Sequence, residues 1–89
     1  MSVELTPKEW SDIVRVLRLS PGQAKVVELI LRGQKDKEIA RQLKLRHSTV
    51  RTYLNRAFQR LGVTDRVGLV LCVMGVYVRA LRPSGDPLR

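Results

Sequence analysis

The chain has 89 residues, with 17 Lys and Arg against eight Asp and Glu and a formal net charge of +9 at pH 7. This length allows at most one domain with a small core, and the charge favours an anionic partner, either nucleic acid or a membrane surface. The single cysteine, Cys72, excludes an intramolecular disulfide and a multi-cysteine metal site, and we interpret it as a packing residue. The longest apolar run, residues 67–78, is too short to cross a bilayer. Since no signal-peptide pattern precedes it, we expect a cytoplasmic protein with no membrane partner.

The first two predicted helices begin with the same pattern. Residues 6–9 (TPKE) and 20–23 (SPGQ) each combine a hydroxyl at the N-cap, proline at the first helical position and Glu or Gln at the third, which is a capping box. The first helix would carry the apolar residues Trp10, Ile13, Val14 and Leu17, with Trp10 as a packing anchor. The second would carry Val26, Val27, Ile30 and Leu31 and end at Gly33.

Residues 34–60 hold eight basic and two acidic residues, so two-thirds of the net charge lies in under a third of the chain. Apolar residues at helical spacing, Ile39, Ala40 and Leu43, predict a helix of about two turns, and Asp36 would cap it or add a negative charge to its first turn. After a short polar break, residues 48–61 place apolar side chains at i, i+3, i+4, i+7, i+8 and i+11. The polar positions between them carry basic residues and no acid.

Gly62 ends that helix, and Thr64 or Asp65 would cap a last one over residues 66–81. This last helix is apolar on every side, with one stripe of Val67, Val70, Leu71, Met74 and Val78 and a second of Leu69, Val73, Val76 and Tyr77. A short chain has little left to cover both, so the sequence predicts a homodimer through the first stripe. The alternative is that the N-terminal helix, with Trp10 and Ile13, folds back over the second.

A short helix, a tight break and a second helix with a basic outer face are the spacing of a helix-turn-helix. Residues 19 to about 70 resemble the LuxR-type (GerE-like) DNA-binding domain of bacterial transcription regulators. The residues that carry the resemblance are Leu19, Val27, Gly33, Lys37, Glu38, Ile39, Ala40, Leu43, Thr49, Val50, Arg51, Leu61, Gly62, Val63 and Arg66. The resemblance implies an all-α fold, a four-helix LuxR-type domain over residues 19–82 with an additional N-terminal helix in residues 1–18 and a flexible tail at 83–89.

The resemblance also implies that the helix at about 48–61 reads DNA in the major groove. The family's base-contacting positions fall on Arg51, Thr52 and Asn55, and these side chains suit guanine, the thymine methyl group and adenine. Its phosphate-contacting positions fall on Lys37, Ser48, Thr49 and Arg66, to which the charge pattern adds Lys35, Arg46, Arg56 and Arg60.

Four positions depart from the family's pattern. Gln23 stands where Glu is usual, and Tyr53 replaces a common His. Lys35 and Arg46 stand where small hydroxyl residues usually cap a helix, and neither can accept the hydrogen bond of a cap. Asp36 and Ser48 are the nearest residues that could.

We therefore predict a transcription regulator that binds specific sites in double-stranded DNA. The sequence contains no catalytic set, metal site, cofactor motif or evident small-molecule site, and His47 is interpreted as a surface residue. Two other functions remain open: a promoter-binding module like sigma-factor region 4, which the stretch NRAFQRL resembles, and a helix-turn-helix used for protein contact. The polar outward face disfavours the second. Whether the chain acts alone or is part of a longer protein stays open.

Overall fold

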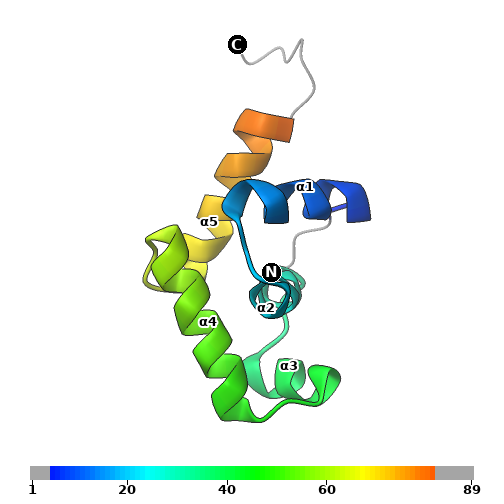
Figure 1. Ribbon diagram of the computed structural model, residues 1–89, viewed down its shortest axis with the longest axis vertical. Helices are drawn as coiled ribbons and strands as arrows, with labels where there is room; N and C mark the ends of the chain where they lie inside the picture. Colours follow the sequence, from blue (N-terminus) through cyan, green and yellow to red (C-terminus); the bar gives the residue numbers. More distant parts are fainter. Residues whose placement is uncertain (1–4, 82–89) are drawn as a thin grey trace.

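The computed structural model describes residues 5–81, which form five α-helices and a short π-helix and contain no strand (Figure 1). The elements are α1 (Pro7–Leu17), α2 (Pro21–Leu31), α3 (Asp36–Leu43), α4 (His47–Leu61), α5 (Arg66–Val76) and the π-helix η1 (Tyr77–Leu81). The all-α prediction is confirmed. The predicted flexible tail at 83–89 lies outside the described residues.

The starts of α1 and α2 are both closed by the predicted capping boxes. The Thr6 hydroxyl accepts a hydrogen bond from the Glu9 N–H at 3.1 Å, and the Glu9 carboxylate accepts one from the Thr6 N–H at 2.9 Å. Ser20 and Gln23 form the same pair at 3.2 and 3.1 Å. Gln23 therefore fills the capping role of the Glu that is usual at this position, because its amide oxygen is an equivalent acceptor.

The starts of α3 and α4 have no side-chain cap. Lys35 and Arg46 occupy the two N-cap positions, and neither makes a cap hydrogen bond through its side chain. At α3 the Glu38 carboxylate accepts from the Lys35 N–H at 2.7 Å, which supplies half of a capping box. Asp36 and Ser48, the nearest residues that could accept a cap hydrogen bond, do not cap these helices. The Asp36 carboxylate is engaged by two arginines instead.

The core is built around α2, which lies in the middle of the molecule (Figure 1). This helix buries more side chains than any other described helix: Ala24, Val26, Val27, Leu29, Ile30 and Leu31. It packs against α4, which contributes Val50, Leu54 and Ala57, and against α3 with Ile39 and Ala40. All the buried residues among the described ones are apolar, so the elements are held together by the hydrophobic effect.

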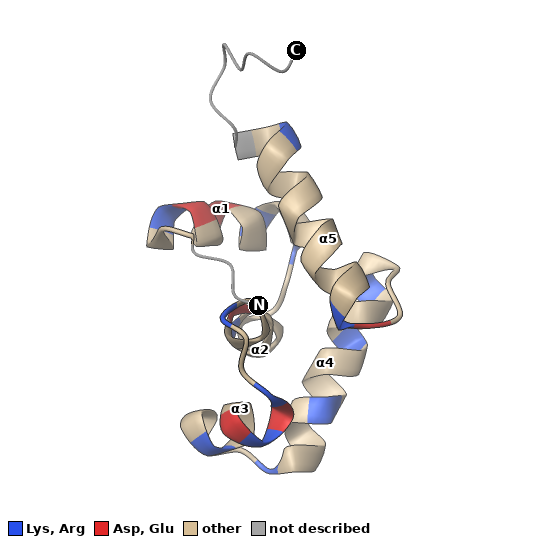
Figure 2. Cartoon of the chain, turned by 180° about the vertical axis from the view of Figure 1, so that it is seen from behind, with Lys and Arg blue, Asp and Glu red and all other residues tan. Residues whose placement is uncertain are grey.

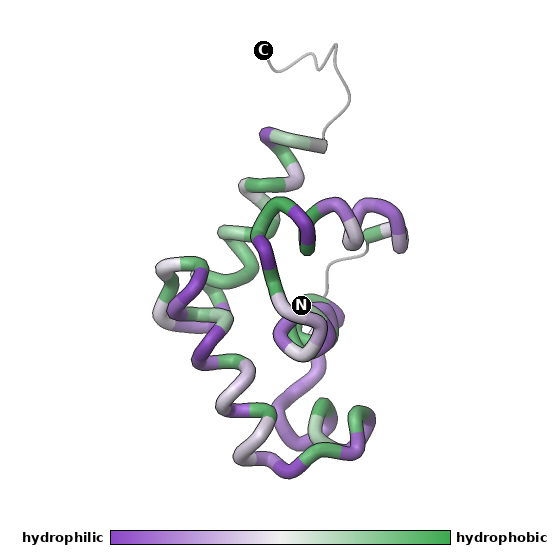
Figure 3. Tube along the Cα trace, in the orientation of Figure 1, coloured by the Kyte–Doolittle hydropathy of each residue, from purple (hydrophilic) through white to green (hydrophobic). Residues whose placement is uncertain are grey.

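The N-terminal helix packs across α5 and η1 (Figure 1). Ile13 of α1 is fully buried, and so are Leu69 and Val73 of α5, with Val76 only 8% exposed. The packing considered as the alternative, in which α1 folds back over the second stripe, therefore occurs. It leaves the other stripe uncovered: Val67, Leu71 and Val78 are 62%, 66% and 45% exposed, with Val70 and Met74 half-buried beside them. Figure 3 shows that α5 is hydrophobic along most of its length.

The last predicted helix, 66–81, is divided between two elements. The Asp65 carboxylate accepts a hydrogen bond from the Gly68 N–H at 2.7 Å, so Asp65, and not Thr64, caps α5. The α-helical turns end at Val76, and the chain continues as the π-helix η1. Within residues 5–81, no single helix is long and apolar enough to cross a membrane; only α4 and residues 66–80 taken together reach the required length and hydropathy, and they meet at a 53° bend.

Candidate DNA-binding surface

Helices α3 and α4 and the turn between them form the helix-turn-helix at one end of the molecule (Figure 1). Lys44 ends α3 in the left-handed conformation, with φ at 57°, and the Leu45 N–H donates to the Ala40 carbonyl at 2.9 Å. This arrangement reverses the chain within three residues and satisfies the last carbonyls of α3. Helix α4 begins at His47, one residue before the predicted start. Its first turns therefore stand at the outer end of the domain.

The three predicted base-contacting residues are exposed on one face of α4. Arg51, Thr52 and Asn55 all point away from the core, which is contacted from the opposite face by Val50 and Leu54. Helical geometry places residues at i, i+1 and i+4 within about 100° of each other around the axis, so the three side chains can meet one ligand. Sequence periodicity predicted this face, and the structure places all three residues on it.

The predicted phosphate-contacting residues surround that face. Lys35, Lys37, Arg46, Ser48, Arg56 and Arg60 are exposed, whereas Thr49 and Arg66 are half-buried. In Figure 2, α4 carries basic segments and no acidic one. The acids of this end of the molecule, Asp36 and Glu38, both lie in the first turn of α3. The surface is therefore cationic, as an anionic ligand requires.

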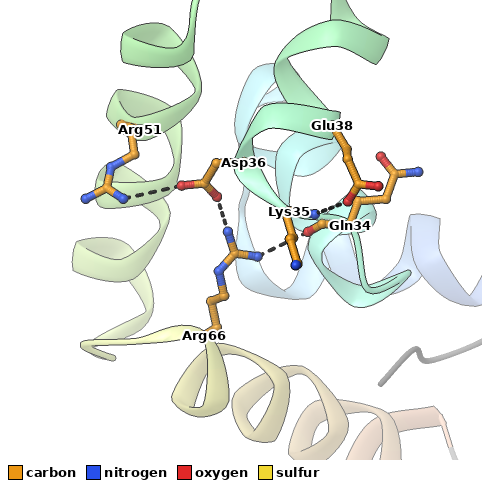
Figure 4. A network of polar contacts seen from close by, with 6 residues as sticks. All are labelled: Gln34, Lys35, Asp36, Glu38, Arg51 and Arg66. Carbon is orange, nitrogen blue, oxygen red and sulfur yellow. Dashed lines mark hydrogen bonds and ion pairs between the residues drawn. The ribbon is translucent and has the colours of Figure 1, made fainter.

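A polar network joins the first residue of α3 to α4 and α5 (Figure 4). Asp36 Oδ2 accepts a hydrogen bond from Arg51 Nη1 at 3.3 Å, and Asp36 Oδ1 accepts one from Arg66 Nη2. Arg66 Nη1 also donates to the Gln34 carbonyl at 3.2 Å. Arg66, predicted only as a phosphate contact, thus ties α5 to the start of α3.

Asp36 is the functional candidate that the sequence did not reveal, because its position predicts only a cap or a negative charge in the first turn of α3. The sequence signal that could have identified it is a carboxylate in a segment with eight basic residues. Which arginine it pairs with could not be read from the sequence, because Arg51 and Arg66 are 15 and 30 residues away along the chain. The contact exists only because three helices converge at this point.

Two shallow grooves flank the helix-turn-helix. The larger, about 320 Å³, is lined by Ile30, Gly33, Gln34, Lys35, Arg66, Val67 and Val70. It runs between the end of α2 and the start of α5, beside the exposed Val67. The smaller, about 210 Å³, lies where the Tyr53 ring covers Gly22 at the start of α2. Tyr53 is therefore a half-buried packing residue, in agreement with the interpretation of its apolar position.

The titratable side chains at the larger groove are the basic Lys35 and Arg66, neither of which is a usual metal ligand. Among residues 5–81, no three His, Cys, Asp or Glu side chains come together as a metal ion would need. The pKa of Glu9 is lowered, chiefly by the hydrogen bond from the Thr6 backbone, against a smaller opposing effect of burial and with help from the Tyr77 hydroxyl. That carboxylate lies on α1 and serves to cap it.

The family model described as "Bacterial regulatory proteins, luxR family" matches residues 17–73. This is more than half of the chain and takes in the whole helix-turn-helix. The chain belongs to the luxR family. The resemblance seen in the sequence is thereby confirmed, and the luxR-family domain is a helix-turn-helix DNA-binding regulator rather than an enzyme. Comparisons with curated proteins and with solved structures gave no match. The match begins at the end of α1, so the helix that covers α5 lies almost wholly outside it.

Proposed function

We propose that this luxR-family domain recognises specific sites in double-stranded DNA by inserting the first turns of α4 into the major groove. The observation that carries the proposal is the exposed, acid-free face formed by Arg51, Thr52 and Asn55. The major groove of B-DNA is about 12 Å wide and admits one α-helix. Within it, Arg can read guanine through two hydrogen bonds, Asn can read adenine, and the Thr methyl group can contact thymine.

We further propose that the surrounding polar residues orient the domain on the DNA backbone. The set is Lys35, Lys37, Arg46, Ser48, Thr49, Arg56, Arg60 and Arg66. Such contacts fix the register of the protein on the duplex without reading its sequence, and they make binding depend steeply on salt. Because Arg66 is 40% exposed while paired with Asp36, its remaining N–H donors stay accessible to a phosphate. We also propose that the chain binds DNA in the cytoplasm.

The uncovered stripe on α5 supports a homodimer. Val67 and Leu71 of α5 and Val78 of η1 are exposed large apolar side chains, and Val70 and Met74 border them. A second copy packed there by two-fold symmetry would cover the stripe, since a homodimer interface uses the same patch on both subunits. Two recognition helices would then lie about 34 Å apart and read a near-palindromic site with half-sites about 10 bp apart.

Selection of bound sequences from random duplexes, followed by binding at several salt concentrations, tests the DNA-binding proposal. If about 5–8 phosphates are neutralised, log K plotted against log salt should have a slope near −5 to −7. Arg51→Ala should cost about 1–3 kcal/mol and relax the preference at one base pair. Lys37→Ala, the matched control, should weaken all duplexes alike and reduce the slope by about one. A slope near zero for the wild type, or equal changes of preference in the two variants, would refute the proposal.

Sedimentation equilibrium tests the dimer. Leu71→Glu places a charge in the exposed stripe and should shift the association to higher concentration. Val16→Glu is the control: it makes the same change on α1, at a side chain that is 52% exposed, and should leave the association unchanged. A wild type that stays monomeric at high micromolar concentration and occupies a single half-site would contradict the dimer and leave DNA recognition by α4 intact.

A further inference from the structure

We infer that Asp36 is a specificity-determining residue that acts by positioning Arg51 for base reading, an inference that rests on the proposed role of α4. The Asp36 carboxylate binds Arg51 from a neighbouring helix at 3.3 Å. It therefore limits where the guanidinium of the exposed Arg51 can lie before DNA arrives. An Arg side chain held in place loses less conformational freedom on binding than a free one, so its contact with a base becomes stronger and more selective.

The ion pair leaves Arg51 able to read a base. A guanidinium has five N–H donors, and Asp36 accepts from Nη1 only. The edge formed by Nε and Nη2, which Asp36 does not contact, is one of the two donor pairs that can donate to both O6 and N7 of guanine. The Arg51 side chain is 57% exposed, so the ion pair does not bury it. Asp36 thus supports Arg51 from the side and does not occupy its reading edge.

Asp36 is itself held firmly, as a positioning residue must be. It is the first residue of α3, and its side chain is only 15% exposed. Its second oxygen is bound by Arg66, which also donates to the Gln34 carbonyl at 3.2 Å. Figure 4 shows the carboxylate between the two arginines, with Arg66 reaching it from α5 and Arg51 from α4. Movement of Asp36 would therefore disturb contacts with two other helices.

Electrostatics gives Asp36 a second effect on selectivity. Its negative charge lies in a segment with eight basic residues and repels the phosphates that those residues attract. Sequence-independent binding depends almost entirely on phosphate neutralisation. The carboxylate should therefore weaken binding to any duplex while it sharpens reading by Arg51, and both effects raise the ratio of specific to non-specific affinity.

Glu38 provides a matched control. It lies in the same first turn of α3 and carries the same charge, but its carboxylate contacts the Lys35 N–H and neither arginine. Glu38→Gln removes one negative charge and keeps an acceptor for that N–H, as Gln23 does in α2. Asp36→Asn removes one negative charge and also weakens the hold on Arg51.

The experiment measures binding of the wild-type chain, D36N and E38Q to the selected duplex, to single-base-pair variants of it and to an unrelated duplex. Non-specific affinity should rise about 2- to 5-fold in both variants, because each loses one charge that repels phosphate. In D36N alone, the preference at the base pair read by Arg51 should fall about 3- to 10-fold, which is part of the discrimination that one bidentate contact gives. In an Arg51→Ala background, D36N should not change that preference further.

The failures of the inference and of the proposed function are distinguishable. Suppose that Arg51→Ala relaxes the preference at one base pair. If D36N then preserves that preference, or lowers the preference at every position alike, the positioning role is overturned and recognition by α4 stands. A wild type that binds all duplexes equally overturns both. D36E keeps the charge but extends the carboxylate by one methylene, so it should lose preference at the same base pair without a gain in non-specific affinity. That variant decides the matter if circular dichroism shows that D36N is unfolded.

Discussion

Replacement of Ile13 by alanine tests whether the N-terminal helix is part of the cooperative core. Ile13 is the one buried side chain of α1 and is fully inaccessible to solvent. It faces the region where α1 crosses α5, whose Leu69 and Val73 are also fully buried. Because the surrounding structure relaxes only partially when a buried side chain is shortened, the truncation should leave a cavity between the two helices.

The magnitude follows from the atoms removed. Ile→Ala deletes three carbons, and at about 0.8 kcal/mol for each buried methylene the lost transfer free energy is about 2.4 kcal/mol. A residual cavity adds to this, so we expect the free energy of unfolding to fall by about 3–4 kcal/mol. For a domain of 60–100 residues, 1 kcal/mol lowers Tm by about 4–8 °C, so the loss should exceed about 12 °C.

Thermal and urea unfolding followed by circular dichroism at 222 nm would measure the effect. Val16→Ala is the control, since Val16 lies on the same helix but is 52% exposed, and it should change the free energy of unfolding by under about 0.5 kcal/mol. The reasoning is refuted if the two variants are equally stable. It is also refuted if Ile13→Ala unfolds in two steps, because α1 would then dock as a separate unit that the remaining helices do not need.

Three further predictions concern local geometry. Gly22→Ala would place a Cβ atom 2.9 Å from the Tyr53 ring. The free energy of unfolding, measured by urea denaturation, should therefore fall by about 1–3 kcal/mol. Lys44→Gly should stabilise the domain by about 0.5–1 kcal/mol in the same assay, because Lys44 has a φ of 57° that glycine adopts without strain. The pKa of Glu9 is lowered from its ordinary 4.5, chiefly by the Thr6 backbone N–H, so ionised Glu9 stabilises the fold above pH 4.5 and this contribution is lost as the pH falls through the lowered pKa. Glu9→Gln should therefore make Tm depend less on pH below 4.5.

Controls for these variants are available in the same chain. At Gly75 a Cβ would meet its nearest neighbour at 3.6 Å, so Gly75→Ala should be tolerated and gain about 0.5–1 kcal/mol from helix propensity. Arg41→Gly lies inside α3 and should lower the free energy of unfolding by about 1 kcal/mol, whereas Lys44→Gly should raise it. A stable Gly22→Ala would contradict the packing of the Tyr53 ring. If Tm of Glu9→Gln depends on pH below 4.5 as strongly as Tm of the wild type does, the role of that carboxylate is contradicted.

The sequence by itself determined most of the helices and the exposed polar face of α4. Capping boxes at Thr6 and Ser20 fixed two helix starts, because the side chains involved are three residues apart and meet in any helix. The apolar spacing of residues 48–61 likewise predicted which side of α4 is buried and left Arg51 on the outer side. These are short-range effects, and the period of the α-helix is enough to derive them.

Only the tertiary structure decided which of the two apolar stripes of α5 is covered. Both stripes are apolar, so periodicity alone does not show which one α1 covers. In the structure α1 packs against α5, where Leu69 and Val73 are buried and Leu71 stays exposed. The same limit applies to Asp36, whose two arginine partners come from other helices. Contacts of this kind depend on how whole helices pack in space, and no spacing along a single helix contains that information.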